Sequence, residues 1–303
     1  MAPTRIVCIL GPTGTGKTRA ALGLGVPTAV INYDSRQVYR DFPIITAQPT
    51  PEERAVCPHL LYGFAPPTER MNAAAFADLA LGAIAEAAAM NRLPVLVGGT
   101  GLYLKALLEG MSPIAEIKKK IREEVLSRLA SEGPQKMHRE LRKIDPDYAA
   151  VIHENDSQRN ARAMEVWLST GRTMTQWHAE AHPRADLDVL KVGIHEDLET
   201  LTPGLAKRID LMVTEGAVEE ARAAWERCPD PTAPAWTGIG CAELLAHVRG
   251  EIDLFTAKRL WVKNTRAYAK RQITWGKKEK DTQWFKKGDV AGLVEAVRQW
   301  LGA

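Results

Sequence analysis

The stretch that decides the fold is Gly11-Pro12-Thr13-Gly14-Thr15-Gly16-Lys17-Thr18, which fits the pattern GxxxxGK[ST]. It follows an apolar run, Arg5–Leu10, that indicates a buried strand, and a helix is expected to begin at Lys17. Glycines let such a loop turn so that successive backbone N–H groups face phosphate oxygens. Lys17 supplies a cation, and the Thr18 hydroxyl is a candidate ligand for Mg²⁺. The sequence therefore predicts a phosphate site formed by residues 11–18.

The strand expected at Leu93–Val97 lacks the acid that usually follows in ATP-driven motors. It runs instead into Gly98-Gly99-Thr100. A nucleotide hydrolase of this kind places a carboxylate there to handle Mg²⁺ and water. The absence of that acid argues against a motor and leaves Thr100 as a neutral hydrogen-bond donor near the phosphates.

Asp34, which follows a second apolar run, Thr28–Tyr33, is the candidate catalytic group. In an open parallel sheet the carboxyl ends of the strands form the ligand crevice, so we expect Asp34 to face the phosphate loop. A carboxylate there can orient a nucleophile or accept its proton. Capping of the next helix, or binding of Mg²⁺ through water, is the alternative. Ser35 and Gln37 lie on the same turn and are candidates to read an edge of the acceptor.

Strand-like runs alternate with helical ones, such as Ala73–Asn91, in the first part of the chain. This alternation predicts an α/β fold, a P-loop NTPase-like core with a parallel sheet flanked by helices. From Ser112 to about Asp186 the pattern is helical and charged; Val189–Ile194 then indicates a returning strand, followed by helices. We therefore expect a core of residues 1–112 and 187–303, with an all-helical insertion domain over 113–186.

Charge is distributed unevenly along the 303 residues, although the net charge is only +3. Residues 118–143 hold nine Lys and Arg against four Asp and Glu, residues 258–287 hold eleven against two, and the remainder is acidic. Two basic blocks in an otherwise acidic chain predict a polyanionic partner held at two places. Solvated helix faces are the alternative for each block.

The second basic block has a cationic face if it is helical. Trp261, Tyr268 and Trp275 would then lie opposite that face and pack on a core, while the cations meet a phosphodiester backbone. Five cations fall within about 60° of one another: Arg259, Lys263, Arg266, Lys270 and Lys277. Arg159 and Arg162, three residues apart, form a weaker pair of the same kind in the insertion.

An ordered series of motifs, spanning nearly the whole chain, resembles the bacterial tRNA dimethylallyltransferases, also called tRNA isopentenyltransferases or the IPP transferase family. The motifs are GPTGTGKT (11–18), DSRQVYR (34–40), PHLLYG (58–63), LVGGTGLYLKALLEG (96–110), QRNARAMEV (158–166) and YAKRQITW (268–275). The last of these, together with GGTGLY after a phosphate loop, is highly specific. The segment 237–243 departs from the family pattern, and only Gly240 is carried over from it, as a structural match.

The resemblance implies that a dimethylallyl group passes from dimethylallyl diphosphate to N6 of the adenosine 3′-adjacent to the anticodon (tRNA position 37), with Mg²⁺ as cofactor. Residues 11–18 would hold the diphosphate, Thr18 would bind the metal, and Lys17 would assist catalysis. Asp34 would deprotonate the amine, and Thr100 would contact the bridging side of the diphosphate. The residues expected to contact the tRNA anticodon stem-loop are Asp34, Ser35, Arg36, Gln37, Thr100, Lys118, Gln158, Arg159, Asn160, Ala161, Arg162, Lys270, Arg271, Gln272, Ile273, Thr274, Trp275, Gly276 and Lys277.

From the residues alone, two other function classes remain open. A P-loop small-molecule kinase would use Asp34 to activate a hydroxyl, which explains the loop and the acid but not the basic helix. A nucleic-acid-dependent NTPase or binding module explains the basic blocks but not the missing strand-end acid. No apolar run approaches the roughly 20 residues that span a bilayer, no signal peptide is visible, and the four cysteines lack metal-site spacing. We therefore expect a cytoplasmic monomer with no membrane partner.

Overall fold

A computed structural model describes residues 3–183 and 186–302 of the chain. The contacts among these residues define two units. Residues 3–108 and 186–302 form the first, termed the core unit, and residues 109–183 form the second, termed the insertion. Within the described ranges, no helix combines the length and the apolar character needed to cross a membrane.

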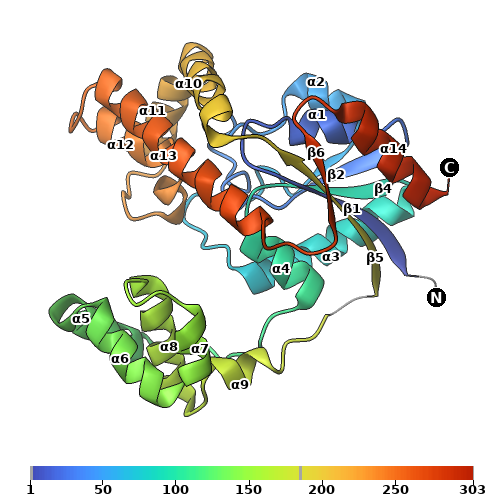
Figure 1. The fold of residues 1–303 in the computed structure, drawn as a ribbon. Coiled ribbons are helices and arrows are strands. Elements are labelled where there is room, and N and C mark those ends of the chain that lie inside the picture. Colours follow the sequence, from blue (N-terminus) through green and yellow to red (C-terminus); the bar gives the residue numbers. More distant parts are fainter. Residues whose placement is uncertain (1–2, 184–185, 303) are drawn as a thin grey trace. The chain divides into compact units, whose positions relative to one another are not determined.

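A six-stranded parallel sheet forms the centre of the core unit (Figure 1). Its strands lie in the order β3-β2-β4-β1-β5-β6, so the predicted α/β fold with a parallel sheet is confirmed. Successive side chains of a strand point to opposite faces, and apolar residues along a strand such as β1 therefore serve two cores. The strands are β1 (Thr4–Leu10), β2 (Thr28–Asn32), β3 (His59–Leu60), β4 (Leu93–Val97), β5 (Leu187–His195) and β6 (Thr282–Lys286).

Helices cover both faces of the sheet. On one face, α3 (Ala73–Ala89) and α4 (Gly101–Glu109) pack with Phe76 and Leu104 against alternate β1 residues such as Ile6. On the other face, α1 (Lys17–Leu22) and α14 (Val290–Leu301) pack against Val7 and Ile9. The sheet is therefore buried on both sides, which matches the continuous apolar runs of its strands.

The remaining helices of the core unit build a third apolar cluster, to which the loop after Asp34 contributes Val38 and Phe42. The long helix α13 packs on α10 and α12 within this group (Figure 1). The elements of this group are α10 (Leu198–Thr214), α11 (Ala217–Arg227), the 3-10 helix η1 (Pro234–Thr237), α12 (Cys241–Val248) and α13 (Leu254–Gly276). The short helix α2 (Pro51–Val56) contributes no residue to this cluster.

Helices are the only regular secondary structure in the described residues of the insertion, which has an apolar core of its own that includes Val125, Met137 and Met164. Glu165 is a buried carboxylate of this unit, and it pairs with Arg122 and Arg162, so it ties two helices together. The helices are α5 (Lys119–Glu132), α6 (Pro134–Ile144), α7 (Pro146–Val151), α8 (Ser157–Thr170) and α9 (Met174–His178).

The sequence did not predict two edge strands, and the expectation that only helices follow Val189–Ile194 was wrong. β3 has two residues, too few to show an alternating pattern. β6 pairs with β5 from Lys191–Thr282 to His195–Lys286. Because β6 lies at the edge of the sheet and most of its side chains face solvent, it contains polar residues such as Gln283 and Lys286 and lacks the continuous apolar run of a buried strand.

Candidate functional site

The phosphate loop, residues 11–18, joins the end of β1 to the start of α1, at the carboxyl edge of the sheet. Gly11 has a φ of 137°, and a Cβ there would lie 2.4 Å from the carbonyl oxygen of Ile194 on β5. A side chain at this position would push the loop off the neighbouring strand. The Thr15 hydroxyl donates to the Pro12 carbonyl at 2.8 Å and closes the turn from inside.

The backbone N–H groups of residues 14–18 have no protein acceptor in the described part of the chain, whereas that of Thr13 donates to Gln272. Five consecutive unpaired donors at a glycine turn form a concave anion site, because each N–H carries a partial positive charge. The Thr18 hydroxyl likewise has no hydrogen bond to any described residue. The loop therefore offers a row of donors and a hydroxyl to a ligand.

Lys17 is half-buried and curls over the loop, with its Nζ donating to the carbonyls of Gly11 (2.9 Å) and Pro12 (3.0 Å). Burial lowers the pKa of its ammonium from 10.5 to about 8; the nearby Asp34 carboxylate opposes this shift and Arg208 adds to it. A bound phosphate would place negative charge beside this ammonium and so favour its protonated form.

Asp34 lies at the end of β2, on a turn that Asn32 shapes. The Asn32 side chain accepts from the Asp34 N–H at 2.7 Å and donates to the carbonyls of Asp34 and Leu61. Oδ1 of Asp34 accepts from the Arg36 N–H at 2.8 Å, which fixes the rotation of the carboxylate. Oδ2 is left to face the adjacent loop, 3.0 Å from where a Cβ of Gly99 would be.

The loop after β4 brings Thr100 to the same place. Its Oγ1 accepts from the Ser35 N–H at 2.9 Å, and its hydroxyl donates to Ser35 Oγ at 3.2 Å. Burial raises the pKa of the Tyr268 hydroxyl, and the Asp34 charge acts in the same direction, so Tyr268 stays a neutral donor beside this carboxylate. The structure thus gathers Asp34, Ser35, Thr100 and Lys17 at the carboxyl ends of β1, β2 and β4.

Arg36 and Gln37, both predicted to contact RNA, hold the turn against the rest of the core unit. Arg36 donates to the Thr237 hydroxyl at 2.8 Å, so the segment that departs from the family pattern packs against this turn. Gln37 donates to the carbonyls of Thr46 and Ala47. Gly240 is the N-cap of α12, and its N–H donates to the buried Glu243.

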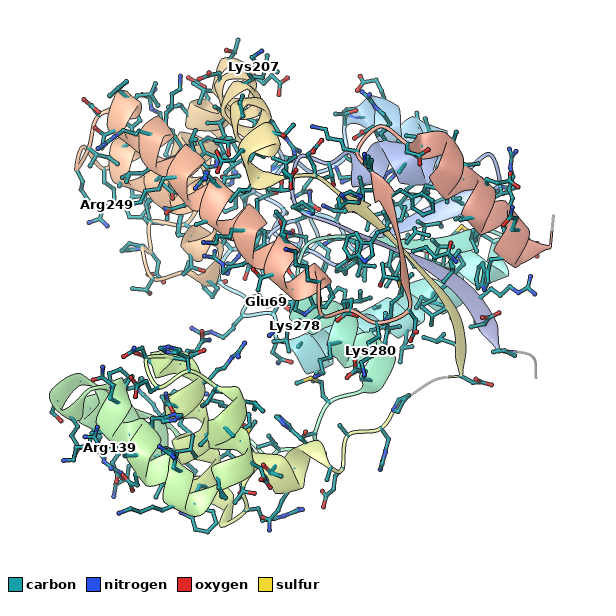
Figure 2. The ribbon with its side chains drawn as sticks, in the orientation of Figure 1. Glu69, Arg139, Lys207, Arg249, Lys278 and Lys280 are labelled. Carbon is teal, nitrogen blue, oxygen red and sulfur yellow. The ribbon has the colours of Figure 1, made fainter. Side chains whose placement is uncertain are left out.

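Helix α13 has the two faces that the sequence predicted, although it ends at Gly276 and Lys277 is its C-cap. Trp261 is buried; Arg259, Lys263, Lys270 and Lys277 are exposed. Arg266 instead pairs with Glu199 of α10 at 2.7 Å. In Figure 2, Lys278 and Lys280 extend the basic character beyond the end of the helix.

The predicted RNA contacts of this segment are not equally accessible. Lys270, Arg271 and Thr274 are exposed, Ile273 and Trp275 are half-buried, and Gln272 and Gly276 are buried. The same holds in the insertion: Lys118, Gln158 and Arg159 are exposed, Arg162 is half-buried, and Asn160 and Ala161 are buried.

Asn160 has a structural task that accounts for its burial. Its amide donates to the carbonyls of His153, Glu154 and Asp156, and its oxygen contacts the His138 ring at 3.0 Å. A fully buried amide with this many partners fixes the loop before α8, and its side chain is occupied within the insertion.

Arg208 of α10 is a site residue that the sequence did not reveal. It is exposed, makes no hydrogen bond or ion pair with the described residues, and is close enough to affect the Lys17 pKa. On the same helix, Leu205 contacts the phosphate loop, since a Cβ of Gly14 would lie 2.9 Å from its Cδ2. No motif or residue spacing in the sequence identifies Arg208 as a site residue, because α10 lies far from the phosphate loop in the sequence.

Taken together, the parallel sheet, the loop after β1 and the row of free N–H groups define a P-loop protein with a carboxylate, Asp34, after the neighbouring strand β2. The family model described as IPP transferase matches residues 37–279, and the chain belongs to this family.

Relatives of known sequence and structure match almost the whole chain. A protein named tRNA dimethylallyltransferase from Maridesulfovibrio salexigens is 56% identical over 298 residues, covering 98% of this chain and 97% of its own. The structure of a tRNA isopentenylpyrophosphate transferase from Bacillus halodurans is 33% identical, with a TM-score of 0.71 and coverage of 99% and 96%. A eukaryotic dimethylallyltransferase, described as acting on tRNA, has a TM-score of 0.77, 28% identity and coverage of 95% and 75%.

The lowered pKa of Lys17 predicts how anion binding depends on pH. Only the protonated ammonium attracts an anion, so pyrophosphate affinity should fall as the pH rises through about 8. Above that pKa the loss approaches about ten-fold per pH unit. The measurement is the ratio of dissociation constants for pyrophosphate in the wild type and Lys17→Met across this range, since the ratio cancels the titration of the ligand itself. A ratio that is constant with pH would contradict the prediction.

Proposed function

We propose that the chain transfers a dimethylallyl group from dimethylallyl diphosphate to N6 of the adenosine 3′-adjacent to the anticodon, giving N6-isopentenyladenosine and diphosphate. The observation that carries this proposal is a carboxylate, Asp34, close enough to Lys17 of the phosphate loop to raise its pKa, together with the free N–H groups of the same loop. Family membership and the names of its relatives support it, and the enzyme would work in the cytoplasm as a monomer.

The donor half of the site would be the phosphate loop with Lys17 and Arg208. When the C1–O bond of the allylic diphosphate breaks, the electron pair stays on the leaving diphosphate, and its negative charge grows. The N–H groups of residues 14–18 have no acceptor among the described residues and would be available to stabilise this charge. Lys17 would release its carbonyl contacts and bind the diphosphate instead.

The acceptor half would be Asp34, Ser35 and Thr100. A new bond forms between C1 of the allyl group and N6 of the adenine, and N6 then loses a proton. Asp34 Oδ2 would orient the amine and accept that proton, while Oδ1 stays bonded to the Arg36 N–H. The adenine must leave its stack to reach a crevice at strand ends, so we propose that it is flipped out of the anticodon loop.

Mg²⁺ fits the residues present and is proposed as the cofactor. The Thr18 hydroxyl has no hydrogen bond to the described residues, and no cluster of three or more His, Cys, Asp or Glu able to hold a metal occurs among them. Mg²⁺ is commonly held by one or two protein oxygens together with substrate phosphates and waters. Thr18 would hold the ion, which would supply positive charge next to the diphosphate.

Each unit would bring its own contacts to the tRNA. In the core unit these are three exposed cations, Lys263 and Lys270 of α13 and its C-cap Lys277, and in the insertion they are Lys118 and Arg159. Only Arg159 of these has a recorded ion pair, the i,i+3 contact with Asp156, among the described residues. Cations that are not neutralised by neighbours suit a phosphodiester backbone.

Incubation with isotope-labelled dimethylallyl diphosphate and unmodified tRNA should place the label in RNA. Nuclease digestion should then yield labelled N6-isopentenyladenosine. A parallel reaction with labelled ATP serves as control for the kinase and NTPase alternatives. Phosphate transfer or release from ATP, with no prenyl label entering RNA, would exclude the proposed function.

Asp34→Asn should lower kcat by about 100- to 10,000-fold, because the amide cannot accept the proton although it can still bond to the Arg36 N–H. Its dissociation constants for tRNA and pyrophosphate should stay within a few-fold of wild type. The matched control is Asp188→Asn, an acid that pairs with Arg5 at the opposite end of the strands. Wild-type turnover in Asp34→Asn would remove Asp34 from the mechanism.

Lys270→Ala should weaken tRNA binding and reduce the slope of log Kd against log salt by about 1, the effect of one lost phosphate contact. The comparison is Lys207→Ala, which removes the same charge from α10, away from Lys278 and Lys280 (Figure 2). Both are measured by fluorescence anisotropy with a labelled anticodon stem-loop. If the slope of log Kd against log salt were the same for the two variants, Lys270 would not contact the phosphodiester backbone of the RNA.

A further inference from the structure

Gln272 joins two loops of the site that are far apart in the sequence. Its Oε1 accepts from the Thr13 N–H in the phosphate loop at 2.8 Å, and its Nε2 donates to the Gly99 carbonyl at 3.2 Å. The side chain is only 8% exposed, and these bonds occupy the amide oxygen and one N–H. The Tyr268 hydroxyl, one turn earlier on α13, donates to the same Gly99 carbonyl at 2.9 Å.

The space around this bridge leaves little freedom. A Cβ at Gly99 would lie 2.2 Å from Gln272 Nε2, 3.0 Å from Asp34 Oδ2 and 3.1 Å from the Tyr268 oxygen. The carboxamide therefore fits only because residue 99 has no side chain. The Gln272 carboxamide lies beside both the proposed base and the proposed diphosphate loop. Its hydrogen bonds, however, are made to backbone groups, the Thr13 N–H and the Gly99 carbonyl.

The bridge also defines which N–H groups of the loop are free. Thr13 N–H is paired with Gln272, and the free donors begin at Gly14. If Gln272 were absent, the Thr13 N–H would lose its partner and the loop would lose its link to α13. The free N–H groups are useful for binding only in the geometry that this link maintains, because donors that must reorganise stabilise an anion less.

We propose that Gln272 is a positioning residue that fixes the phosphate loop against the Gly98–Thr100 loop, so that the diphosphate and the acceptor base meet in register. This inference rests on the proposed function. It assigns the buried face of α13 to the donor site, while the exposed face carries the cations proposed to bind tRNA. Gln272 acts through Thr13 and Gly99 and not by contact with the substrate.

The test is pyrophosphate binding, measured by calorimetry without turnover, in Gln272→Met, Gln272→Glu and a control, Gln299→Ala, in α14. Met keeps most of the packing volume and helix propensity but has neither hydrogen bond. We expect its affinity for pyrophosphate to fall about ten-fold or more, the size of effect that misplaced binding groups produce. Affinity for the anticodon stem-loop should stay within two-fold, roughly 0.4 kcal/mol.

Gln272→Glu gives a readout that packing alone cannot produce. A protonated carboxyl can accept from the Thr13 N–H and donate to the Gly99 carbonyl, whereas a carboxylate cannot donate and repels the anion. Its pyrophosphate affinity relative to wild type should therefore recover as the pH falls, and Gln272→Met should show no such recovery. Wild-type affinity in Gln272→Met, or a pH-independent ratio for Gln272→Glu, would overturn the proposal.

These outcomes are separate from the proposed function. Prenyl transfer by the wild type tests the reaction, while the variants test only how the loop is held. If Gln272→Met does not fold, Gln272→Glu compared with wild type across pH decides the inference by itself. A wild type that prenylates tRNA together with an unaltered Gln272→Met would keep the function and remove the positioning role.

Discussion

Backbone N–H groups that have no partner in the protein are the constraint on which the rest of the structure depends. A folded chain normally pairs such groups, since leaving them unpaired away from water is costly. Residues 14–18 keep theirs free because Gly11 lets the loop approach β5 and Thr15 closes the turn from within. The loop is thereby held open for an anion by contacts that leave the N–H groups of residues 14–18 free.

Three parallel strands end at the same edge, and this brings together segments that are remote in sequence and that would form the proposed two-substrate site. β1 supplies the phosphate loop, β2 supplies Asp34 and β4 supplies Thr100. Short polar side chains fix their relative positions: Asn32 shapes the Asp34 turn, and Thr100 bonds to Ser35. Because α13 bonds to the loops at this edge through Tyr268 and Gln272, one helix would serve both the proposed chemistry and the proposed RNA surface.

The sequence predicted those parts of the molecule that have a local signature. The apolar runs gave the parallel sheet, the glycine pattern gave the loop, and helical periodicity separated the cations of α13 from Trp261. It could not predict partners that depend on tertiary contact. Gln272 meets Thr13 across 259 residues, and within the motif it looks like another polar group for RNA. The burial of Asn160 and the proximity of Arg208 to Lys17 also depend on tertiary structure, and no local sequence pattern predicts them.

The charges of the crevice fit the proposed reaction as a set. Before transfer, the Asp34 carboxylate raises the Lys17 pKa and partly offsets the burial that lowers it. During transfer, the diphosphate gains negative charge while Asp34 takes up the proton from N6 and becomes neutral. The total charge near Lys17 therefore stays constant although its position shifts from the carboxylate to the leaving group. A site whose cations face a constant total charge does not have to reorganise as the bond breaks, which is the condition for strong electrostatic stabilisation.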